Sequence, residues 1–298
     1  MYDIIVIGGG PAGISAAIYA ASRGKKTLVL EKDKVGGIIG KVSTVTHYTA
    51  IVEGETGATF ARRMESQALA AGVEIAREEV IGAKLVGDVK EIRTVGNTYL
   101  AQRVVIAGGS SPRKLGVPGE KELSGKGMGM NAARDGEAYR GKNIYIVGGA
   151  DGAVKEALYL ARFAKTLTII HFEEKLGCIP EFAVKVAAAD NIKLMLRSRL
   201  TAVGGSGRVE WLEITNEDNG AKQKIRDDGC GIFVYAGTVP NTDIYGELEL
   251  ENGFIPVDEK MRTAIDGVYA AGDIRVKQLR QVATAVADGA IAAVNAAL

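Results

Sequence analysis

The stretch DIIVIGGGPAGISAAIYAASRGKKTLVLEKD, residues 3–33, decides the fold. Residues 3–7 form a short apolar run typical of a buried strand, and residues 27–30 form a second one that ends at Glu31. Between them, residues 14–22 have the apolar spacing of a helix. We therefore predict a strand, a glycine-rich turn, a helix and a second strand, as at the start of a parallel α/β sheet.

The turn matches the pattern G-x-G-x-x-G at Gly8, Gly10 and Gly13. The first glycine allows the tight turn, the second lets the backbone approach a pyrophosphate, and the third lets helix and strand pack closely. Glu31 is placed to accept hydrogen bonds from ribose hydroxyls. The alternative is a tight turn without a ligand, but strand, helix and acid fall in register. A dinucleotide site is predicted, and this stretch does not separate FAD from NAD.

The segment NIYIVGGADGAVKEALYLARFAKTLTIIHFEEK, residues 143–175, repeats this layout without a gap. Such a repeat predicts two dinucleotide-binding domains. In the second copy Ala150 stands in place of Gly10, so a methyl group occupies the position where the backbone would meet a pyrophosphate. His171 stands in place of Glu31.

The predicted second nucleotide site consists of Gly148, Gly149, Ala150, Asp151, Gly152, Ala153, His171 and Glu173. Glu173 and Glu174 would repel a 2′-phosphate, so NADH is favoured over an NADP-type ligand. The alternative is a domain that keeps its fold and has lost its nucleotide. Both interpretations stay open at this point.

Composition narrows the class of protein. A chain of 298 residues is long enough for two domains, and Lys+Arg 37 against Asp+Glu 36 suggests neither nucleic acid nor an anionic membrane as a partner. The two cysteines, Cys178 and Cys230, exclude a disulfide framework and a thiolate zinc site, and no metal is predicted. No apolar run reaches the roughly 18 residues of a membrane span, and the apolar start is interpreted as a strand. We expect a cytoplasmic protein.

Three further segments carry a family resemblance: RVVIAGGSSPRKLGVPGE (103–120), GIFVYAGTVPN (231–241) and FIPVDEKMRTAIDGVYAAGDIRVKQLRQVATAVADGAIAAVNAAL (254–298). With the two turns, they resemble the low-molecular-weight thioredoxin reductases, within the flavoprotein disulfide reductase class. The resemblance implies an α/β fold of two Rossmann-like, three-layer ββα dinucleotide-binding domains, the second inserted in the first. The implied limits are 1–115 and 243–298 for an FAD-binding domain and 116–242 for an inserted NAD(P)-binding-like domain. A homodimer is also implied.

The resemblance places the flavin as well. Gly272 and Asp273 would hold the ribityl chain, and Arg280, Gln281 and Val282 would lie beside the isoalloxazine, at the start of a last helix whose positive end faces the ring. The alternative is an amphipathic closing helix. The other predicted FAD contacts are Gly8, Gly10, Pro11, Ala12, Gly13, Glu31, Lys32, Gly37, Ile38, His47, Val80, Ala107 and Gly108.

The chain departs from the family pattern where reactive sulfurs are expected. Residues 131–136, NAARDG, match the family's Cys-Ala-x-Cys-Asp-Gly, with Asn131 and Arg134 in place of both cysteines. Neither side chain can form or attack a disulfide. Asp135 is a candidate proton relay, with capping of the following turn as the alternative. Arg134 is a candidate attractant for an anionic acceptor, with a solvated surface arginine as the alternative.

A second departure lies near the predicted flavin. Ile38 stands where the family usually has Gln, and His47 lands where an Asn would face the flavin. A histidine there could shuttle protons near neutral pH or stack on the ring. The alternative is a packed imidazole.

These observations predict an FAD-dependent oxidoreductase that passes electrons to a small-molecule or protein acceptor without a dithiol of its own. NADH is the favoured donor. One alternative is an electron-transfer module fed by ferredoxin without pyridine nucleotide. Another is a non-catalytic FAD-binding sensor or assembly protein.

Overall fold

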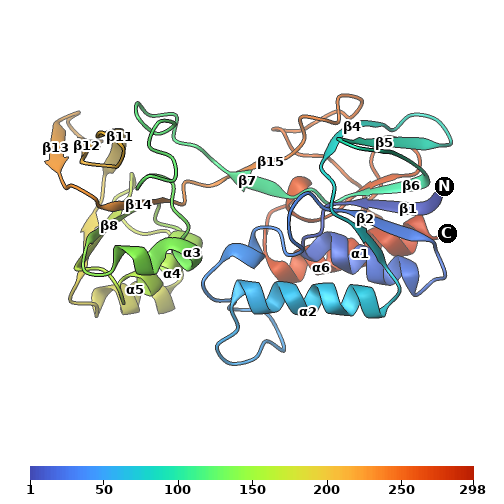
Figure 1. Ribbon diagram of the computed structural model, residues 1–298, viewed down its shortest axis with the longest axis horizontal. Coiled ribbons are helices and arrows are strands. Elements are labelled where there is room, and N and C mark those ends of the chain that lie inside the picture. The colour runs from blue at the N-terminus through green and yellow to red at the C-terminus, as the bar shows by residue number, and fades with distance from the viewer. The chain divides into compact units, whose positions relative to one another are not determined.

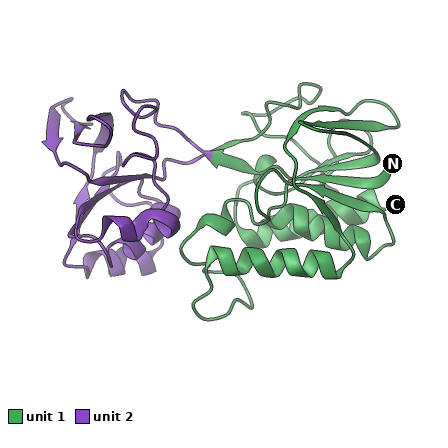
Figure 2. Cartoon of the chain, in the orientation of Figure 1, with its two compact units in different colours: residues 1–111, 239–298 green, residues 112–238 purple.

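The computed structural model describes residues 1–298, which form two compact units (Figure 2). Unit 1 is Met1–Ser111 with Val239–Leu298, and unit 2 is Pro112–Thr238. The limits predicted from the sequence, 115/116 and 242/243, lie a few residues further along the chain. The chain instead leaves unit 1 at β7 (Ser110–Pro112) and returns at β15 (Thr238–Pro240), and these two strands pair with each other.

Unit 1 is built on a parallel sheet. In spatial order its strands are β3 (Glu74–Ala76), β2 (Thr27–Leu30), β1 (Tyr2–Ile7), β6 (Thr98–Ile106) and β16 (Val268–Ala270). β1 lies in the middle with Ile4 opposite Thr27, so the strand that precedes the glycine-rich turn is buried on both faces.

Each face of this sheet has its own apolar core. The helices α1 (Pro11–Ala21), α2 (Gly57–Ala70) and α6 (Val282–Ala296) cover one face, and β4 (Val80–Lys84) and β5 (Lys90–Thr94) lie toward the other (Figure 1). β5 pairs antiparallel with the first half of β6, and β4 pairs antiparallel with β5. Short 3₁₀ turns occur at η1 (Ile39–Lys41) and η3 (Gly272–Ile274). The result is the predicted three-layer arrangement.

Unit 2 repeats this plan on a smaller scale. Its parallel sheet has the order β10 (Ile192–Met195), β9 (Thr166–Ile170), β8 (Asn143–Val147) and β14 (Gly231–Val234). One face packs against α3 (Ala132–Asp135), η2 (Gly136–Tyr139), α4 (Asp151–Leu160) and α5 (Pro180–Ala187). The other face packs against the antiparallel strands β11 (Ser198–Gly204), β12 (Trp211–Asn216) and β13 (Lys222–Arg226). The predicted α/β class, with one unit inserted in the other, is confirmed.

α1 and α6 pack with their backbones almost touching. A Cβ on Gly289 would lie 2.0 Å from the Ala12 carbonyl oxygen, so no larger residue fits there. The Ser15 hydroxyl donates to the Val286 carbonyl oxygen at 2.7 Å, across the same contact. This packing places the first turn of α1 against the middle of α6.

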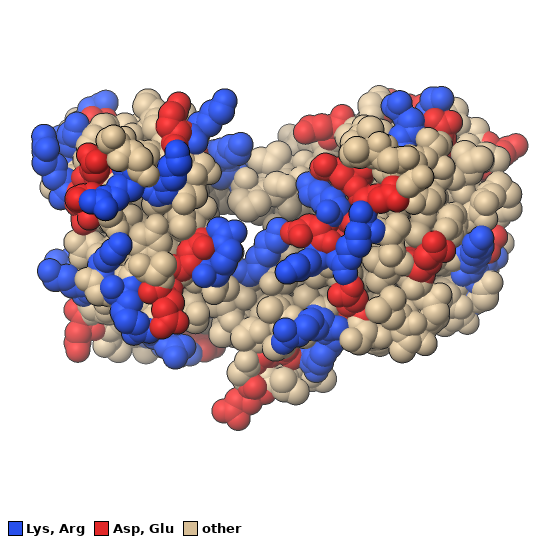
Figure 3. Space-filling model, in the orientation of Figure 1, with Lys and Arg blue, Asp and Glu red and all other residues tan.

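On the face of the molecule shown in Figure 3, neither sign of charge predominates. Basic and acidic side chains are interspersed on both units in the face shown in Figure 3, in keeping with the near-neutral charge balance. None of the helices has both the length and the apolar character needed to cross a bilayer.

Candidate functional site

Two of the three glycines in the first turn are required by the protein's own packing. Gly8 has φ +104°, and a Cβ there would lie 2.5 Å from the Ala107 carbonyl oxygen. A Cβ on Gly13 would lie 1.8 Å from the Gly8 carbonyl oxygen. A Cβ on Gly10, by contrast, would meet no atom within 4 Å. Gly10 therefore leaves room for something that is not part of the chain.

The helix that follows this turn is open to an anion. Gly10 is the N-cap of α1 and offers no side chain, Pro11 occupies the first turn, and no acidic residue lies there. The remaining N–H groups and the positive end of the helix dipole are thus available to a phosphate.

Glu31 is held beside the turn at the end of β2. Its carboxylate accepts the Gly9 N–H at 2.8 Å and the Asp33 N–H at 2.9 Å. The neighbouring Lys32 is exposed and lies 3.6 Å from Glu79. These two hydrogen bonds therefore orient the Glu31 carboxylate beside the glycine-rich turn.

The loop after Glu31 lies against the same turn. The Gly36 N–H donates to the Gly9 carbonyl oxygen at 2.9 Å, and a Cβ on Gly37 would lie 3.4 Å from Gly10 Cα. Ile38, which follows, is exposed. This loop brings Gly37 next to Gly10.

Gly272 and Asp273 come from the far end of the chain to the same place. Gly272 has φ +82°, and a Cβ there would lie 2.8 Å from the Ala12 side chain. Asp273 Oδ1 is buried and has no hydrogen-bond partner in the chain. Burial raises the pKa of Asp273, while Lys277 and Arg280 oppose the rise. A buried acceptor without a donor, beside a helix N-terminus, marks a ligand position.

The start of α6 lies where the sequence predicted it. The helix begins at Val282 with Gln281 as its N-cap. The Arg280 guanidinium lies over the Phe254 ring at 4.1 Å, and its buried Nε has no partner. Sequence reasoning missed Phe254, because nothing in FIPV distinguishes it from an ordinary apolar residue.

The remaining predicted flavin contacts differ in burial. Ala107 is buried, Val80 is half-buried, and the Gly108 carbonyl oxygen accepts from Asn241 Nδ2 at 2.8 Å. His47 is exposed and has φ +57°. It is therefore not a packed imidazole; the packed side chain is Tyr48, against Phe60. The interpretation of His47 as a proton shuttle stays a prediction.

In unit 2, positions 131 and 134 form a closed polar network. Asn131 is the N-cap of α3, and its Oδ1 accepts the Arg134 N–H at 2.9 Å. Arg134 donates to both Asp135 oxygens, at 2.6 and 2.7 Å, and Asp135 also accepts the Asn131 N–H at 2.8 Å. The hydrogen bond from Arg134 holds the pKa of Asp135 below its ordinary value.

This network bears on two of the predictions. A carboxyl group with a lowered pKa is ionised at neutral pH, so Asp135 would be a poor proton donor. Its side chain makes no capping hydrogen bond to the following turn, Gly136–Tyr139, so the capping interpretation gains no support either. Arg134 is 71% exposed in its side chain, but Asp135 already neutralises its charge. Its interpretation as an attractant for an anionic acceptor stays a prediction.

The second turn keeps its shape and changes its surroundings. Gly148 has φ +131°, and a Cβ there would lie 2.4 Å from the Tyr235 carbonyl oxygen. A Cβ on Gly149 would lie 2.5 Å from the ring of His171, which is only 5% exposed. His171 Nε2 is 3.1 Å from Glu173 Oε2, and its Nδ1 has no partner.

The helix after the second turn carries an acid in its first turn. Asp151 follows the N-cap Ala150 and accepts the Ile179 N–H at 2.8 Å. A Cβ on Gly152 would meet no atom within 4 Å. Ala153, which stands in the position of Gly13, is buried, and its Cβ lies 3.1 Å from the position that a Cβ on Gly148 would take. The backbone can therefore approach a ligand at Gly152. At the start of α4, however, Ala150 adds a methyl group and Asp151 adds a negative charge beside the turn.

The arginines near the end of β9 are all paired with acids. Arg197 donates to Glu174 at 2.7 Å and to Asp218 at 2.9 Å. Arg199 lies 2.9 Å from Glu217 and stacks over Phe172. Both arginines here are therefore paired with acids, whereas the exposed Lys175 is in none of these ion pairs.

Comparison with known proteins assigns the fold to a family. The model of the family described as pyridine nucleotide-disulphide oxidoreductase matches residues 2–289. The chain belongs to this family. A thioredoxin reductase of Peptoclostridium acidaminophilum is 40% identical over 302 residues, which cover 99% of this chain and 96% of the relative.

Solved structures agree with this assignment. Thioredoxin reductase of Lactococcus lactis has a TM-score of 0.95 at 35% identity, over 99% of this chain and 98% of that one. A ferredoxin-flavin thioredoxin reductase of Clostridium acetobutylicum has a TM-score of 0.54 at 29% identity, over 99% and 96%. The protein is a flavin-dependent oxidoreductase of the thioredoxin reductase type.

The two cysteines of this oxidoreductase lie on opposite faces of the unit 2 sheet. Cys178 packs at the core on the helix face, whereas Cys230 is buried in the core under the antiparallel strands. Burial raises the pKa of Cys230 to about 12 and also raises that of Cys178. They cannot form a disulfide with each other without unfolding.

We predict that Cys230 of the native protein stays unlabelled by a thiol reagent at pH 8, because only the thiolate reacts and burial suppresses it. Cys178, which is only partly buried, should react slowly. Mass spectrometry after timed labelling measures both, with the unfolded protein as the control for full reaction. Rapid native labelling of Cys230 would contradict this account.

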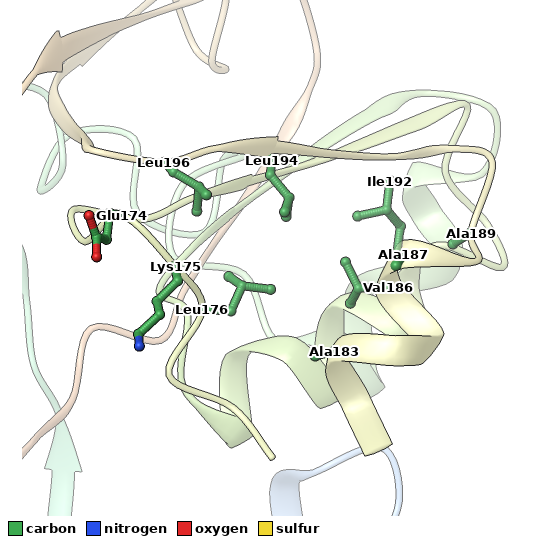
Figure 4. Close-up of a pocket in the computed structure, with 10 residues that line it drawn as sticks. All are labelled: Glu174, Lys175, Leu176, Ala183, Val186, Ala187, Ala189, Ile192, Leu194 and Leu196. Atoms are coloured by element: carbon green, nitrogen blue, oxygen red, sulfur yellow. The ribbon is translucent and has the colours of Figure 1, made fainter. Parts of the chain in front are cut away.

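A separate hollow in unit 2 lies between α5 and β10 (Figure 4). It is lined mainly by apolar side chains, among them Leu176, Val186, Ile192 and Leu194, with Glu174 and Lys175 at one end. Of the residues named for the second nucleotide site, only Glu174 lines it, and it holds no group able to carry redox chemistry.

Proposed function

We propose that the chain is an FAD-dependent oxidoreductase on a thioredoxin reductase scaffold that takes electrons from NADH and delivers them to a small-molecule or protein acceptor. It does so without a dithiol of its own. The observation that carries the proposal is the network of Asn131, Arg134 and Asp135. It fills the positions that match the family's cysteine pair with groups that cannot be oxidised to a disulfide.

Unit 1 fits FAD on two independent features. The open space at Gly10, under the N-terminus of α1, suits a pyrophosphate. The buried Asp273 Oδ1, which has no donor within the chain, suits a ribityl hydroxyl. When bound, FAD would supply the two-electron transfer between donor and acceptor.

The protein's own groups would set the properties of the flavin. Asp273 would accept a hydroxyl hydrogen bond and orient the ribityl chain. The N-terminus of α6 and Arg280 would place positive charge near the ring, which favours the reduced, negatively charged flavin. Glu31 would receive the ribose hydroxyls.

NADH is the proposed donor because of the charges at the end of β9. Glu173 contacts His171, and Arg197 is neutralised by Glu174 and Asp218. A 2′-phosphate would therefore meet acidic groups, whereas two ribose hydroxyls could donate to them.

A second candidate is an electron-transfer protein that receives electrons from ferredoxin. The His171 ring under Gly149 and the methyl group of Ala150 favour it, because both change the turn that would otherwise hold a pyridine nucleotide. One similar structure is that of a ferredoxin-flavin thioredoxin reductase.

An anaerobic titration of the yellow protein with NADH, NADPH and reduced ferredoxin distinguishes these functions. We expect NADH to bleach the visible flavin absorbance at about tenfold lower concentration than NADPH, since one like-charge contact is worth ~1 kcal/mol or more. Bleaching by ferredoxin alone would support the second candidate. Bleaching by no donor would favour a flavin-binding sensor or assembly protein.

A variant tests the origin of the preference. Glu173→Gln removes one of the acidic groups and should narrow the difference between NADH and NADPH by a few fold. Glu181→Gln, on the exposed part of α5 where Glu181 pairs with Lys185, is the matched control. An unchanged preference in Glu173→Gln would show that Glu173 does not face the nucleotide.

A further inference from the structure

A buried ionic cluster lies directly behind the Gly272–Asp273 turn. Asp288, in the middle of the otherwise apolar α6, is 4% exposed. Its carboxylate accepts the Gly272 N–H at 3.1 Å, two Arg275 N–H groups at 2.8 and 2.6 Å, and the Lys277 ammonium at 2.7 Å. The Lys277 side chain is also only 4% exposed.

A buried ionic cluster is an energetically unfavourable alternative to apolar packing in a core. Each buried ion costs several kcal/mol of desolvation, and well-packed apolar residues would often stabilise a fold as well or better. Burial works against ionisation of Asp288, yet its bonds to Arg275 and Lys277 hold its pKa below the ordinary value. The carboxylate is therefore charged, and a role other than stability is indicated.

The geometry ties the cluster to the flavin position. Gly272 adopts φ +82° and touches Ala12 at the start of α1, and the Asp288 carboxylate holds its N–H. The next residue, Asp273, presents the buried oxygen that has no partner. The cluster contains two cations and one anion, so it carries one net positive charge that ionised Asp273 would balance.

We propose that Asp288 is a positioning residue for the flavin: it fixes the Gly272–Asp273 turn through the Gly272 N–H and holds the Lys277 ammonium beside Asp273, whose buried oxygen is then placed to accept a ribityl hydroxyl. This inference rests on the proposed binding of FAD by unit 1. Asp288 itself does not touch the flavin. It acts through Gly272 and through the charge beside Asp273.

The test measures FAD affinity of the full-length apoprotein by fluorescence titration, together with the midpoint unfolding temperature with and without FAD. Asp288→Asn should weaken FAD binding about tenfold or more, because it loosens the turn and leaves two cations uncompensated. Lys277→Met, which leaves Asp288 paired with Arg275, should weaken it a few fold and lower the midpoint potential of the bound flavin, because positive charge is lost.

The matched control is Glu55→Gln. Glu55 is another buried carboxylate of unit 1, paired with Arg63 and Thr59, none of which is among the predicted flavin contacts. This variant should unfold at a lower temperature but keep native FAD affinity and potential. FAD binding stabilises by linkage, so a loss of affinity also reduces the temperature gain on adding FAD.

Each outcome decides the inference. FAD affinities of both variants within twofold of native, with equal losses of stability with and without FAD, would reduce Asp288 to a structural residue. If Asp288→Asn does not fold, the affinity and potential of Lys277→Met decide. A native protein that takes up no FAD would overturn the proposed function itself, and this inference with it.

Discussion

A Gly13→Val variant is expected to be purified without flavin and to lose about 3 kcal/mol or more of unfolding free energy. A Cβ at this position would lie 1.8 Å from the Gly8 carbonyl oxygen, which is far inside van der Waals contact. Only a shift of α1 away from β1 could relieve the overlap. That shift would also move the helix N-terminus and Ala12 away from the Gly272 turn.

Flavin content per chain and denaturant unfolding measure this prediction. Gly152→Ala in unit 2, where a Cβ meets nothing within 4 Å, is the control and should remain yellow. Gly10→Ala separates fold from ligand: the chain leaves room for its Cβ, so the variant should fold normally and bind FAD more weakly. A Gly13→Val protein with native flavin content would show that the turn does not hold the cofactor.

The double variant Asn131→Cys/Arg134→Cys is expected to acquire a redox-active disulfide that the native chain lacks. The Asn131 side chain already points at residue 134, as the 2.9 Å bond to its N–H shows, so the two sulfurs would lie within bonding reach. Removing Arg134 also frees Asp135, whose pKa should then return toward its ordinary value.

Thiol counting and flavin-dependent disulfide reduction measure the gain. We expect the oxidised double variant to show no more thiols than the native protein's two, and to reduce a small disulfide at least about tenfold faster than the native protein. The single variants, each with one new sulfur, are the controls. Native turnover equal to that of the double variant would show that the two new sulfurs do not carry the electrons, which would contradict this prediction.

Much of the fold could be predicted because each unit contains a strand–turn–helix–strand segment that is continuous in sequence. The strand over 27–30 is found as predicted, and the helix predicted over 14–22 is Pro11–Ala21, since proline suits the first turn of a helix. The antiparallel strands β4 and β5 could not be placed individually. They are short, with Gly82 inside one of them, and gain their apolar partners only when the third layer assembles.

The site divides in the same way. Gly8, Gly13 and Gly272 are recognisable because a backbone conformation or a close approach demands glycine there. The contact of Phe254 with Arg280 and that of Asp288 with Arg275 and Lys277 depend on tertiary packing. The Arg134–Asp135 pair was unexpected because the side chains of adjacent residues in a helix do not face each other. Here α3 ends at Asp135, so helical geometry no longer keeps the two side chains apart.

Because β7 pairs with β15, the two connections between unit 1 and unit 2 lie side by side, which would allow unit 2 to be replaced by another domain. Around these strands, the Arg113 N–H donates to the Gly237 carbonyl oxygen at 2.9 Å, and the Asn241 N–H to that of Gly109 at 3.1 Å. If unit 2 were removed, the two ends left in unit 1 would be neighbours, and a short turn could join Ser111 to Val239. Excision of residues 112–238 should leave a miniature flavoprotein, onto which a different donor module could be grafted.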